Sequence, residues 1–244
     1  MKVVVVVPTY NERENIGDLI AALHGLGIDG LHVLVVDDGS PDGTADIVRE
    51  IAGARGGVEL LLRGGARGRG HAGRDGFLRA LELGADRVVE MDADFSHDPR
   101  SVPALLAAID RGADVALGSR FVAGGAERNR GWLRRAITRL ANLYIRVMFG
   151  IAILDSNSGF RAFRREALAG IDPATLASPG PAIVQEVLFR ATRRGYKIAE
   201  TPILFVNRER GHSKLGVAQL LQGYFAVLRL RLGEIFGGSR ARRG

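Results

Sequence analysis

Short apolar runs alternate with segments of helical spacing through the first half of the chain. The runs are Val3–Val7, Leu31–Val36, Val58–Leu62, Arg87–Met91 and Asp114–Leu117. They are continuous, whereas a strand with one solvated face would alternate apolar and polar residues. Buried strands joined by helices predict an α/β fold with a mostly parallel sheet covered by helices on both faces. Ligands of such sheets bind at the carboxyl ends of the strands.

The pattern changes after Gly118, but no linker interrupts it. The predicted elements are an arginine-rich helix Trp132–Phe149, a polar turn Asp155–Gly159, a break at Ser178–Pro181, a further helix, a short strand Pro202–Val206 and a last helix Leu215–Phe236. We therefore expect one domain over residues 1–236, with a front half (1–120) and an elaborated back half (121–236). The basic tail over residues 237–244 is predicted to be disordered.

The composition excludes several classes of protein. The 244 residues are 46% hydrophobic and 25% charged, as in an ordinary globular chain. The absence of cysteine excludes disulfides, cysteine-ligated zinc, iron–sulfur clusters and thiol catalysis. The apolar run near the start is far shorter than the roughly 20 residues that span a bilayer, and no signal-peptide pattern follows it. We expect a cytoplasmic protein.

The charge is strongly basic and comes from arginine. The net charge is +7, and of 34 Lys and Arg residues only Lys2, Lys197 and Lys214 are lysine. The planar guanidinium group binds two phosphate oxygens at once, which favours phosphate-bearing partners. A solvated basic surface is the alternative.

Polar clusters follow three of the predicted strands. They are Pro8–Glu12, Asp37–Thr44 and Asp92–His97. Asp, Ser, Thr and Asn are also good turn and cap residues, and this is the alternative for Asp42 and Thr44. Carboxylates gathered at one edge of a sheet repel each other, however, unless a cation lies among them. Several clusters at one edge therefore indicate a binding site.

Asp92 and Asp94 are two positions apart in an extended segment, so their side chains leave on the same side. Carboxylate oxygens without cysteine or paired histidine select a hard ion, Mg²⁺ or Mn²⁺, which takes further ligands from substrate phosphates. The expected ligand is a diphosphate bound through the metal ion. His71, His97 and His212 are further candidate ligands or proton carriers, although a lone histidine is more often structural.

The segment Gly68–Gly73 matches the glycine pattern of dinucleotide-binding proteins. That fingerprint normally lies in the first turn between strand and helix, which here is Pro8–Glu12, so we discount the match. The chain also lacks the phosphate-binding P-loop pattern.

Six motifs follow one another along the chain: Pro8–Glu12, Val35–Thr44, Asp92–His97, Gly118–Arg120, Ser158–Arg161 and Arg208–Lys214. In this order they resemble the motifs of the dolichol-phosphate (polyprenol-phosphate) mannose synthases, which are inverting family-two glycosyltransferases. The resemblance implies a GT-A fold, GDP-mannose as donor, a polyprenyl phosphate as acceptor, and Mg²⁺ or Mn²⁺ held by the Asp-x-Asp element. Many members carry a Thr near position 157, where this chain has Asn157. Because this segment is expected to contact the sugar, the difference bears on which sugar is transferred.

The resemblance also implies roles for single residues. Those for the nucleotide sugar are Pro8, Thr9, Tyr10, Glu12, Val36, Asp37, Asp38, Asp92, Ala93, Asp94 and Arg208. The metal would bind Asp92, Asp94 and Ser96. Asp92, Asp94 and Arg120 are the catalytic candidates.

No general base is required, because a phosphate monoester with a second pKa near ~6 is already largely ionised at neutral pH. Arginines are needed instead to hold the acceptor phosphate. The candidates are Arg120, Arg134 and Lys214, with Arg208 near the diphosphate. For Arg134 the alternative is an ordinary place on an amphipathic surface helix.

Two other functions remain open. The first keeps the fold and acceptor but uses UDP-glucose or another nucleotide sugar. The second is a non-catalytic nucleotide- or RNA-binding module; only 6% aromatic residues and carboxylates at the expected binding edge argue against nucleic acid.

The last predicted helix suggests how the chain meets a lipid substrate. Apolar residues between Val217 and Ile235 recur at three- and four-residue spacing, and arginines follow from Arg229 onward. Such a helix is too short and too charged to cross a bilayer but suits its surface. We therefore expect peripheral association with the cytoplasmic face of the membrane; packing of this helix on the sheet is the alternative.

Overall fold

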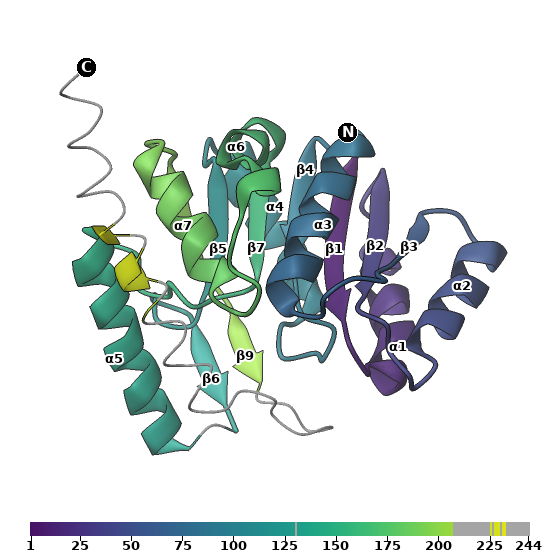
Figure 1. Ribbon diagram of the computed structural model, residues 1–244, viewed down its shortest axis with the longest axis horizontal. Coiled ribbons are helices and arrows are strands. Elements are labelled where there is room, and N and C mark those ends of the chain that lie inside the picture. The colour runs from purple at the N-terminus through teal and green to yellow at the C-terminus, as the bar shows by residue number, and fades with distance from the viewer. Residues whose placement is uncertain (130, 207–224, 226, 230, 233–244) are drawn as a thin grey trace.

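The computed structural model describes residues 1–129, 131–206, 225, 227–229 and 231–232. The strands of the main sheet are β1 (Val3–Thr9), β2 (Leu31–Asp37), β3 (Val58–Leu62), β4 (Arg87–Glu90), β5 (Val115–Ser119), β7 (Arg161–Arg164) and β8 (Ile198–Pro202). Their order is β3-β2-β1-β4-β7-β5-β8 (Figure 1). A small second sheet pairs β6 (Ala126–Arg128) with β9 (Leu204–Val206).

The main sheet is mostly parallel, as predicted. β1 pairs in parallel with β2 and β4, β2 with β3, and β5 with β8. Only β7 runs antiparallel, between β4 and β5. The carboxyl ends of β1, β2, β4 and β5 therefore lie at one edge, which is where the predicted polar clusters begin.

Helices cover both faces of this sheet (Figure 1). The helices on one face are α1 (Arg13–His24), α2 (Thr44–Ala54) and α4 (Val102–Asp110). Those on the other are α3 (Arg69–Glu82), α6 (Arg165–Ile171) and α7 (Ile183–Arg193). Single 3₁₀ turns cover Pro99–Ser101 and Pro173–Thr175.

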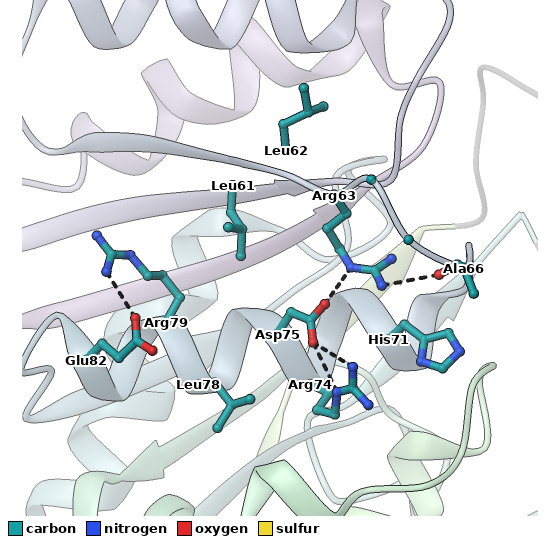
Figure 2. Close-up of a pocket in the computed structure, with 12 residues that line it drawn as sticks. Leu61, Leu62, Arg63, Ala66, His71, Arg74, Asp75, Leu78, Arg79 and Glu82 are labelled. Carbon is teal, nitrogen blue, oxygen red and sulfur yellow. Dashed lines mark hydrogen bonds and ion pairs between the residues drawn. The ribbon is translucent and has the colours of Figure 1, made fainter.

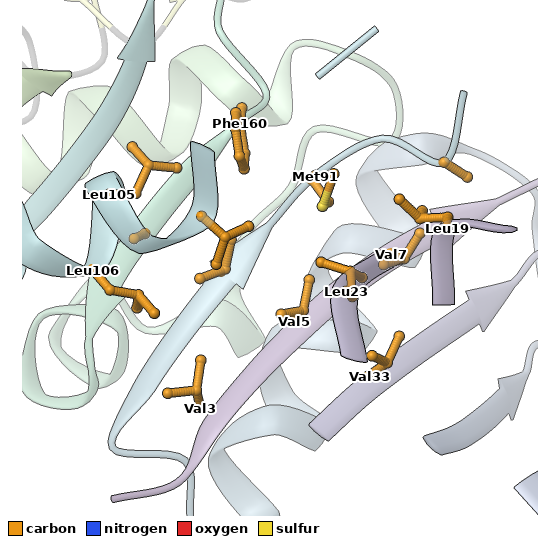
Figure 3. Close-up of a cluster of buried hydrophobic side chains, with 14 of the residues drawn as sticks. Val3, Val5, Val7, Leu19, Leu23, Val33, Met91, Leu105, Leu106 and Phe160 are labelled. Atoms are coloured by element: carbon orange, nitrogen blue, oxygen red, sulfur yellow. The ribbon is translucent and has the colours of Figure 1, made fainter. Parts of the chain in front are cut away.

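The valines of β1 serve two separate cores, because alternate side chains of a strand point to opposite faces. Val5 packs on the side of Leu19 and Leu23 from α1 (Figure 3). Val6 packs on the other side, with Phe77 from α3. A strand buried on both sides must be apolar at every position, which explains the uninterrupted valine run.

Two features of the back half differ from the sequence-based expectation. The strand β7 was not predicted, because Arg161 and Arg164 interrupt its apolar pattern. The predicted strand Pro202–Val206 is wrong as a single element: β8 ends at Pro202 and β9 begins at Leu204. The chain passes from one sheet to the other between them, with the side chain of Ile203 buried in the core.

The helix predicted at Trp132–Phe149 is present with these bounds as α5. Most of the predicted helix Leu215–Phe236 lies outside the described residues, as does the tail 237–244. The described residues at 225, 227–229 and 231–232 are helical, and Val227 packs against Phe149 and Phe189. Among the helices that the structure describes, none is long and apolar enough to span a membrane.

Candidate active site

The ends of β1 and β2 are joined through Asp37. Its carboxylate is fully buried and accepts the hydroxyl of Thr9 (3.0 Å), the backbone N–H of Ser40 (2.9 Å) and the hydroxyl of Ser40 (2.6 Å). Both carboxylate oxygens are thus used inside the protein. Thr9 and Asp37, which the resemblance assigns to the nucleotide, lie at the predicted edge and hold the turn after β2 in shape.

Asp38 faces the loop after β3 instead. It forms an ion pair with Arg63 and accepts the backbone N–H of Gly68 at 2.6 Å. Arg63 continues to Asp75 of α3 at 2.7 Å, as Figure 2 shows. The loop between β3 and α3 is therefore tied to the end of β2, although Arg63 carried no signal in the sequence.

A groove of about 540 Å³ lies beside this loop. Figure 2 draws the residues that line it. One wall is formed by residues 61–66 and the other by the outer side of α3, from His71 to Glu82. Of the predicted candidates that the structure describes, only His71 lines it. The strand-end clusters form a separate region.

The turn after β1 is held by the turn after β2. Asn11 has a positive φ of 56° and donates its backbone N–H to the hydroxyl of Ser40 (2.9 Å). The backbone N–H of Glu12 donates to Thr44 Oγ1 (3.0 Å). Thr44 in turn donates its hydroxyl to Asp42 (2.6 Å), so Asp42 and Thr44 act as turn and helix-start residues, in agreement with the alternative interpretation.

Tyr10 borders the same edge. Arg67 Nη1 donates to the Tyr10 hydroxyl oxygen at 3.0 Å, and the guanidinium carbon lies 5.0 Å from the centre of the ring. Arg67 also approaches the carbonyl of Gly39 (3.4 Å). A cation therefore borders the predicted nucleotide region, from a loop that the sequence analysis did not single out.

The Asp-x-Asp element forms a tight turn directly after β4. Asp94 Oδ1 accepts both the backbone N–H (3.0 Å) and the hydroxyl (2.6 Å) of Ser96, and Phe95 between them has a φ of 56°. The side chain of Asp92 is one-third exposed. Asp94 and Ser96 are therefore in contact two residues beyond Asp92. The expectation of an extended segment from Asp92 to Asp94 is wrong, because the backbone bends over residues 93–96.

These oxygens suit a hard divalent cation. Mg²⁺ commonly binds one or two carboxylates and completes its shell with water and phosphate oxygens. Among the described residues no group of three or more His, Cys, Asp and Glu side chains is arranged to hold a metal ion. The predicted ligands Asp92, Asp94 and Ser96 offer only part of a coordination shell, so a cation there would need further oxygens from water or a diphosphate.

A buried cluster of charged residues contacts Asp92 through Arg69. Glu90, the last residue of β4, is fully buried between Arg161 of β7 (Nε–Oε2 3.0 Å) and Arg69 of α3 (Nη1–Oε1 3.1 Å). Arg69 also donates to Asp92 Oδ1 at 3.3 Å. Sequence analysis missed this cluster, although a glutamate inside a buried strand is a signal for a buried cation partner.

His97 lies against the other side of Asp92. Its ring is almost fully buried, and Nδ1 is 3.9 Å from Asp92 Oδ2. Burial lowers the pKa of His97 below its ordinary value, in spite of the opposing charges of Asp92 and Asp94. The ring is therefore neutral at pH 7.

Arg120 directly follows β5, as expected, but its guanidinium is already engaged. Nε and Nη2 bind the two oxygens of Asp155 at 2.7 and 2.6 Å, and Nη1 lies 3.5 Å from Glu127. The guanidinium of Arg120 lies 5.1 Å from the centre of the Phe205 ring, and the rings of Phe205 and His97 meet edge-on with their centres 5.6 Å apart. Arg120 and the Asp-x-Asp element therefore lie in one site.

The first turn of α5 joins this cluster through Arg135, the neighbour of the predicted Arg134. Arg135 donates to the carbonyl of Glu127 at 3.0 Å and lies 3.8 Å from its carboxylate. Arg134 is exposed. Arg208 and Lys214 lie outside the described residues.

In the turn 155–159, the side chain of Asn157, which departs from the family pattern, contacts two helices. The amide of Asn157 donates to Asn142 of α5 (2.6 Å) and accepts from Gln185 of α7 (2.7 Å), so it links two helices. Gly159 lies on the other side, where an added Cβ would be 2.7 Å from Arg69 Nη2. Glycine at 159 lets the turn close over Arg69.

The glycines at 68 and 70 serve packing at the start of α3. A Cβ at Gly70 would lie 1.9 Å from the carbonyl oxygen of Ser178, and Gly68 has a φ of 150°. The N–H of Gly70 donates to Pro179 at 2.9 Å. This agrees with our decision to discount the dinucleotide pattern.

Residues 4–171 match the model of the family described as Glycosyl transferase family 2. The chain belongs to glycosyl transferase family 2. This glycosyltransferase is 41% identical, over 93% of its length, to the polyprenol monophosphomannose synthase of Mycolicibacterium smegmatis and covers 85% of that protein. It is 40% identical to the undecaprenyl-phosphate mannosyltransferase of Micrococcus luteus, with 100% of both chains covered. The predicted resemblance to polyprenol-phosphate mannose synthases is confirmed.

A third relative is the dolichol-phosphate mannosyltransferase of Pyrococcus furiosus, with 38% identity over 88% of this chain and 59% of that protein. Among solved structures, glucosyl-3-phosphoglycerate synthase of Mycobacterium tuberculosis with Mn²⁺, UDP and glucosyl-3-phosphoglycerate superposes with a TM-score of 0.69. The identity is 23%, over 95% of this chain and 80% of that one. The GT-A fold expected of this family-two glycosyltransferase is confirmed.

Proposed function

We propose that this glycosyltransferase moves mannose from GDP-mannose to the phosphate of a polyprenyl phosphate, with inversion at the anomeric carbon. The observation that carries the proposal is the continuous path from Asp92 and Asp94, through the Arg120 cluster, to α5. Oxygen ligands for a cation thus lie beside arginines, which lie beside an exposed apolar helix. A nucleotide diphosphate, an acceptor phosphate and a lipid chain need these surroundings in this order.

The donor binds over the ends of β1, β2 and β4 in this proposal. The turns that carry Pro8, Tyr10, Glu12, Val36 and Asp38 surround the nucleoside, and Arg67 adds a cation at the rim. Asp92, Asp94 and Ser96 hold Mg²⁺ or Mn²⁺ when it is bound. Such an ion stabilises the negative charge that develops on a departing diphosphate.

The transfer itself needs no proton acceptor. The acceptor phosphate is largely a dianion at neutral pH, so its oxygen attacks the anomeric carbon directly and GDP leaves from the opposite side. Arg120 and its neighbours orient that phosphate behind the sugar, and this alignment supplies much of the rate. One displacement gives a β-linked mannosyl phosphate from an α-linked donor.

The outer face of α5 supports contact with a membrane surface. Its exposed apolar side chains include Trp132, at 80% exposure, and Val147, at 72%. The others on this face are Leu133, Ile137, Leu140 and Leu143. A row of arginines at positions 135, 139 and 146 follows one flank of this stripe. An apolar face flanked by cations is typical of helices that lie in the surface of an anionic leaflet.

The sequence suggested the Leu215–Phe236 segment for this contact, and most of that segment lies outside the described residues. The exposed apolar face of α5 supports a membrane contact independently of it. Through Arg135 and Glu127 this helix is tied to Arg120. A phosphate headgroup held at Arg120 would then lie next to the surface in which its polyprenyl chain is dissolved. Peripheral association with the cytoplasmic face of the membrane is part of the proposal.

The test is a panel of labelled nucleotide sugars offered with polyprenyl phosphate and Mg²⁺ or Mn²⁺. We expect a butanol-soluble product from GDP-mannose that disappears in EDTA and carries a β linkage by NMR. Preference for a UDP-sugar would contradict the donor, and an α-linked product would contradict direct displacement. Salt-sensitive RNA retention without any sugar transfer would favour the non-catalytic alternative.

A further inference from the structure

Arg67 lies near the end of the loop between β3 and α3, and the backbone on both sides of it is fixed. Arg63 Nη2 donates to the carbonyl of Ala66 at 3.2 Å, and the N–H of Gly68 donates to Asp38 Oδ2 at 2.6 Å. The ion pair of Arg63 with Asp38 closes this arrangement. The loop therefore presents residue 67 at one place beside the end of β2.

The side chain of Arg67 is exposed and reaches across the ends of two strands. Its Nη1 donates to the Tyr10 hydroxyl oxygen after β1 (3.0 Å), and its Nη2 donates to the Gly39 carbonyl after β2 (3.4 Å). These partners are a hydroxyl and a carbonyl, whereas Arg63 and Arg120 at the same edge each bind a carboxylate. Arg67 thus holds its fork of N–H donors on two oxygens that are not carboxylate oxygens.

The position of Arg67 favours contact with the nucleoside rather than with the diphosphate. Arg67 spans the ends of β1 and β2, whereas the Asp-x-Asp element follows β4, which lies on the opposite side of β1 from β2. The ring of Tyr10, 5.0 Å from the guanidinium carbon, is a flat surface of the kind on which bases stack. A base on this ring would lie beside the guanidinium group.

We propose that Arg67 recognises the guanine base of the donor, by donating the same two N–H groups to its O6 and N7. Guanine carries these two acceptors side by side, and arginine binds both with its fork. Adenine carries an amino group in place of O6, and uracil is a single ring without N7, so neither base accepts both bonds. The inference rests on the proposed function in that GDP-mannose is taken as the donor.

A ligand and a substitution test the contact together. The analogue 7-deaza-GDP has carbon in place of N7 and is otherwise identical to GDP. Arg67→Met keeps a long side chain but removes the donors. Arg111→Met is the matched control, because Arg111 is exposed at the end of α4, before β5 begins, and so lies at the opposite edge of the sheet.

The measurement is the affinity of each protein for GDP, 7-deaza-GDP and UDP by titration calorimetry with Mg²⁺ in excess, with the melting temperature recorded. We expect wild type and Arg111→Met to bind 7-deaza-GDP at least ~5-fold more weakly than GDP. Arg67→Met should bind these two ligands equally, and GDP at least ~5-fold more weakly than wild type does. Its UDP affinity and melting temperature should match those of wild type.

Wild type that binds 7-deaza-GDP as tightly as GDP would overturn the inference, as would a preference for GDP over 7-deaza-GDP that persists in Arg67→Met. Equal losses for GDP and UDP in Arg67→Met would place this side chain on the diphosphate and would also overturn it. These outcomes leave the proposed donor intact, because wild type would still prefer GDP to UDP. Tighter binding of UDP than of GDP by wild type would contradict both the donor and this role of Arg67.

Discussion

The two halves of the site are built by different kinds of contact. On the nucleotide side, Asp37 and Asp94 each close their own turn: Asp37 binds Ser40, three residues away, and Asp94 binds Ser96, two residues away. Longer contacts, such as the ion pair of Asp38 with Arg63, then join these turns to each other and to neighbouring loops. On the acceptor side, the contacts join residues that are far apart in the sequence. Arg120 binds the carboxylate of Asp155, 35 residues away, and the backbone N–H of Asp155 donates to Glu200, 45 residues away.

This difference predicts how each half responds to change. A turn closed by neighbouring residues forms with little loss of chain entropy, and damage to it stays local. The acceptor side depends on buried charges that only the complete fold brings together. Removing one partner there leaves an uncompensated charge in the interior.

The largest effect on activity is expected from Asp94→Asn. The variant keeps the hydrogen bonds that shape the turn but loses the negative charge offered to a cation, so turnover should fall by at least about 10²-fold. The melting temperature should remain close to that of wild type. Near-normal transfer by this variant, or by wild type in EDTA, would remove Asp94 from the mechanism.

The largest effect on stability is expected from Asp155→Asn. Arg120 would keep Glu127 at 3.5 Å but lose its bidentate partner, and breaking a buried pair costs about 3–5 kcal/mol. Chemical denaturation checks this value. A loss below ~1 kcal/mol would show that the acceptor side is no more dependent on distant contacts than the nucleotide side.

Substitutions on the exposed apolar face of α5 should weaken membrane binding and leave nucleotide binding unchanged. Leu140→Glu combined with Val147→Glu places two charges on the exposed stripe, and we expect at least about tenfold weaker sedimentation with anionic vesicles. GDP binding should not change. Leu62→Glu, on an exposed leucine of the edge strand β3, is the matched control and should bind vesicles like wild type. Equal vesicle binding by both variants would contradict the membrane role of α5.

The smallest effect concerns Asp42. Partial burial raises its pKa, but the hydrogen bonds from Thr44 and Arg13 outweigh burial and hold the pKa below its ordinary value. Its contribution to stability is therefore present above the ordinary pKa of aspartate, ~3.9, and is lost as the pH falls through the folded value. Asp42→Ala should destabilise the protein by about 1 kcal/mol at pH 7 and by less at pH 3. An equal loss at both pH values would show that the charge is irrelevant.

Much of the nucleotide side could be predicted from the sequence because its signals are local. Uninterrupted apolar runs indicate strands buried on both faces, and parallel strands bring their carboxyl ends to one edge. The clusters around Asp38 and Asp94 therefore had to meet there. The helix α5 was also predictable, since its 3.6-residue periodicity lies within one segment.

The partners of buried charges were decided only by the tertiary structure. Nothing near Glu90 indicates that Arg161 and Arg69 surround it, and nothing near Arg120 indicates Asp155. The antiparallel strand β7 carries Arg161 into the sheet, where its charge is stable only because Glu90 lies opposite. Likewise, the amphipathic pattern of α5 did not reveal that its broad apolar face points outward, because periodicity defines a face but not what covers it. Such choices depend on which distant segments pack together, since a buried charge requires a partner that the local sequence does not contain.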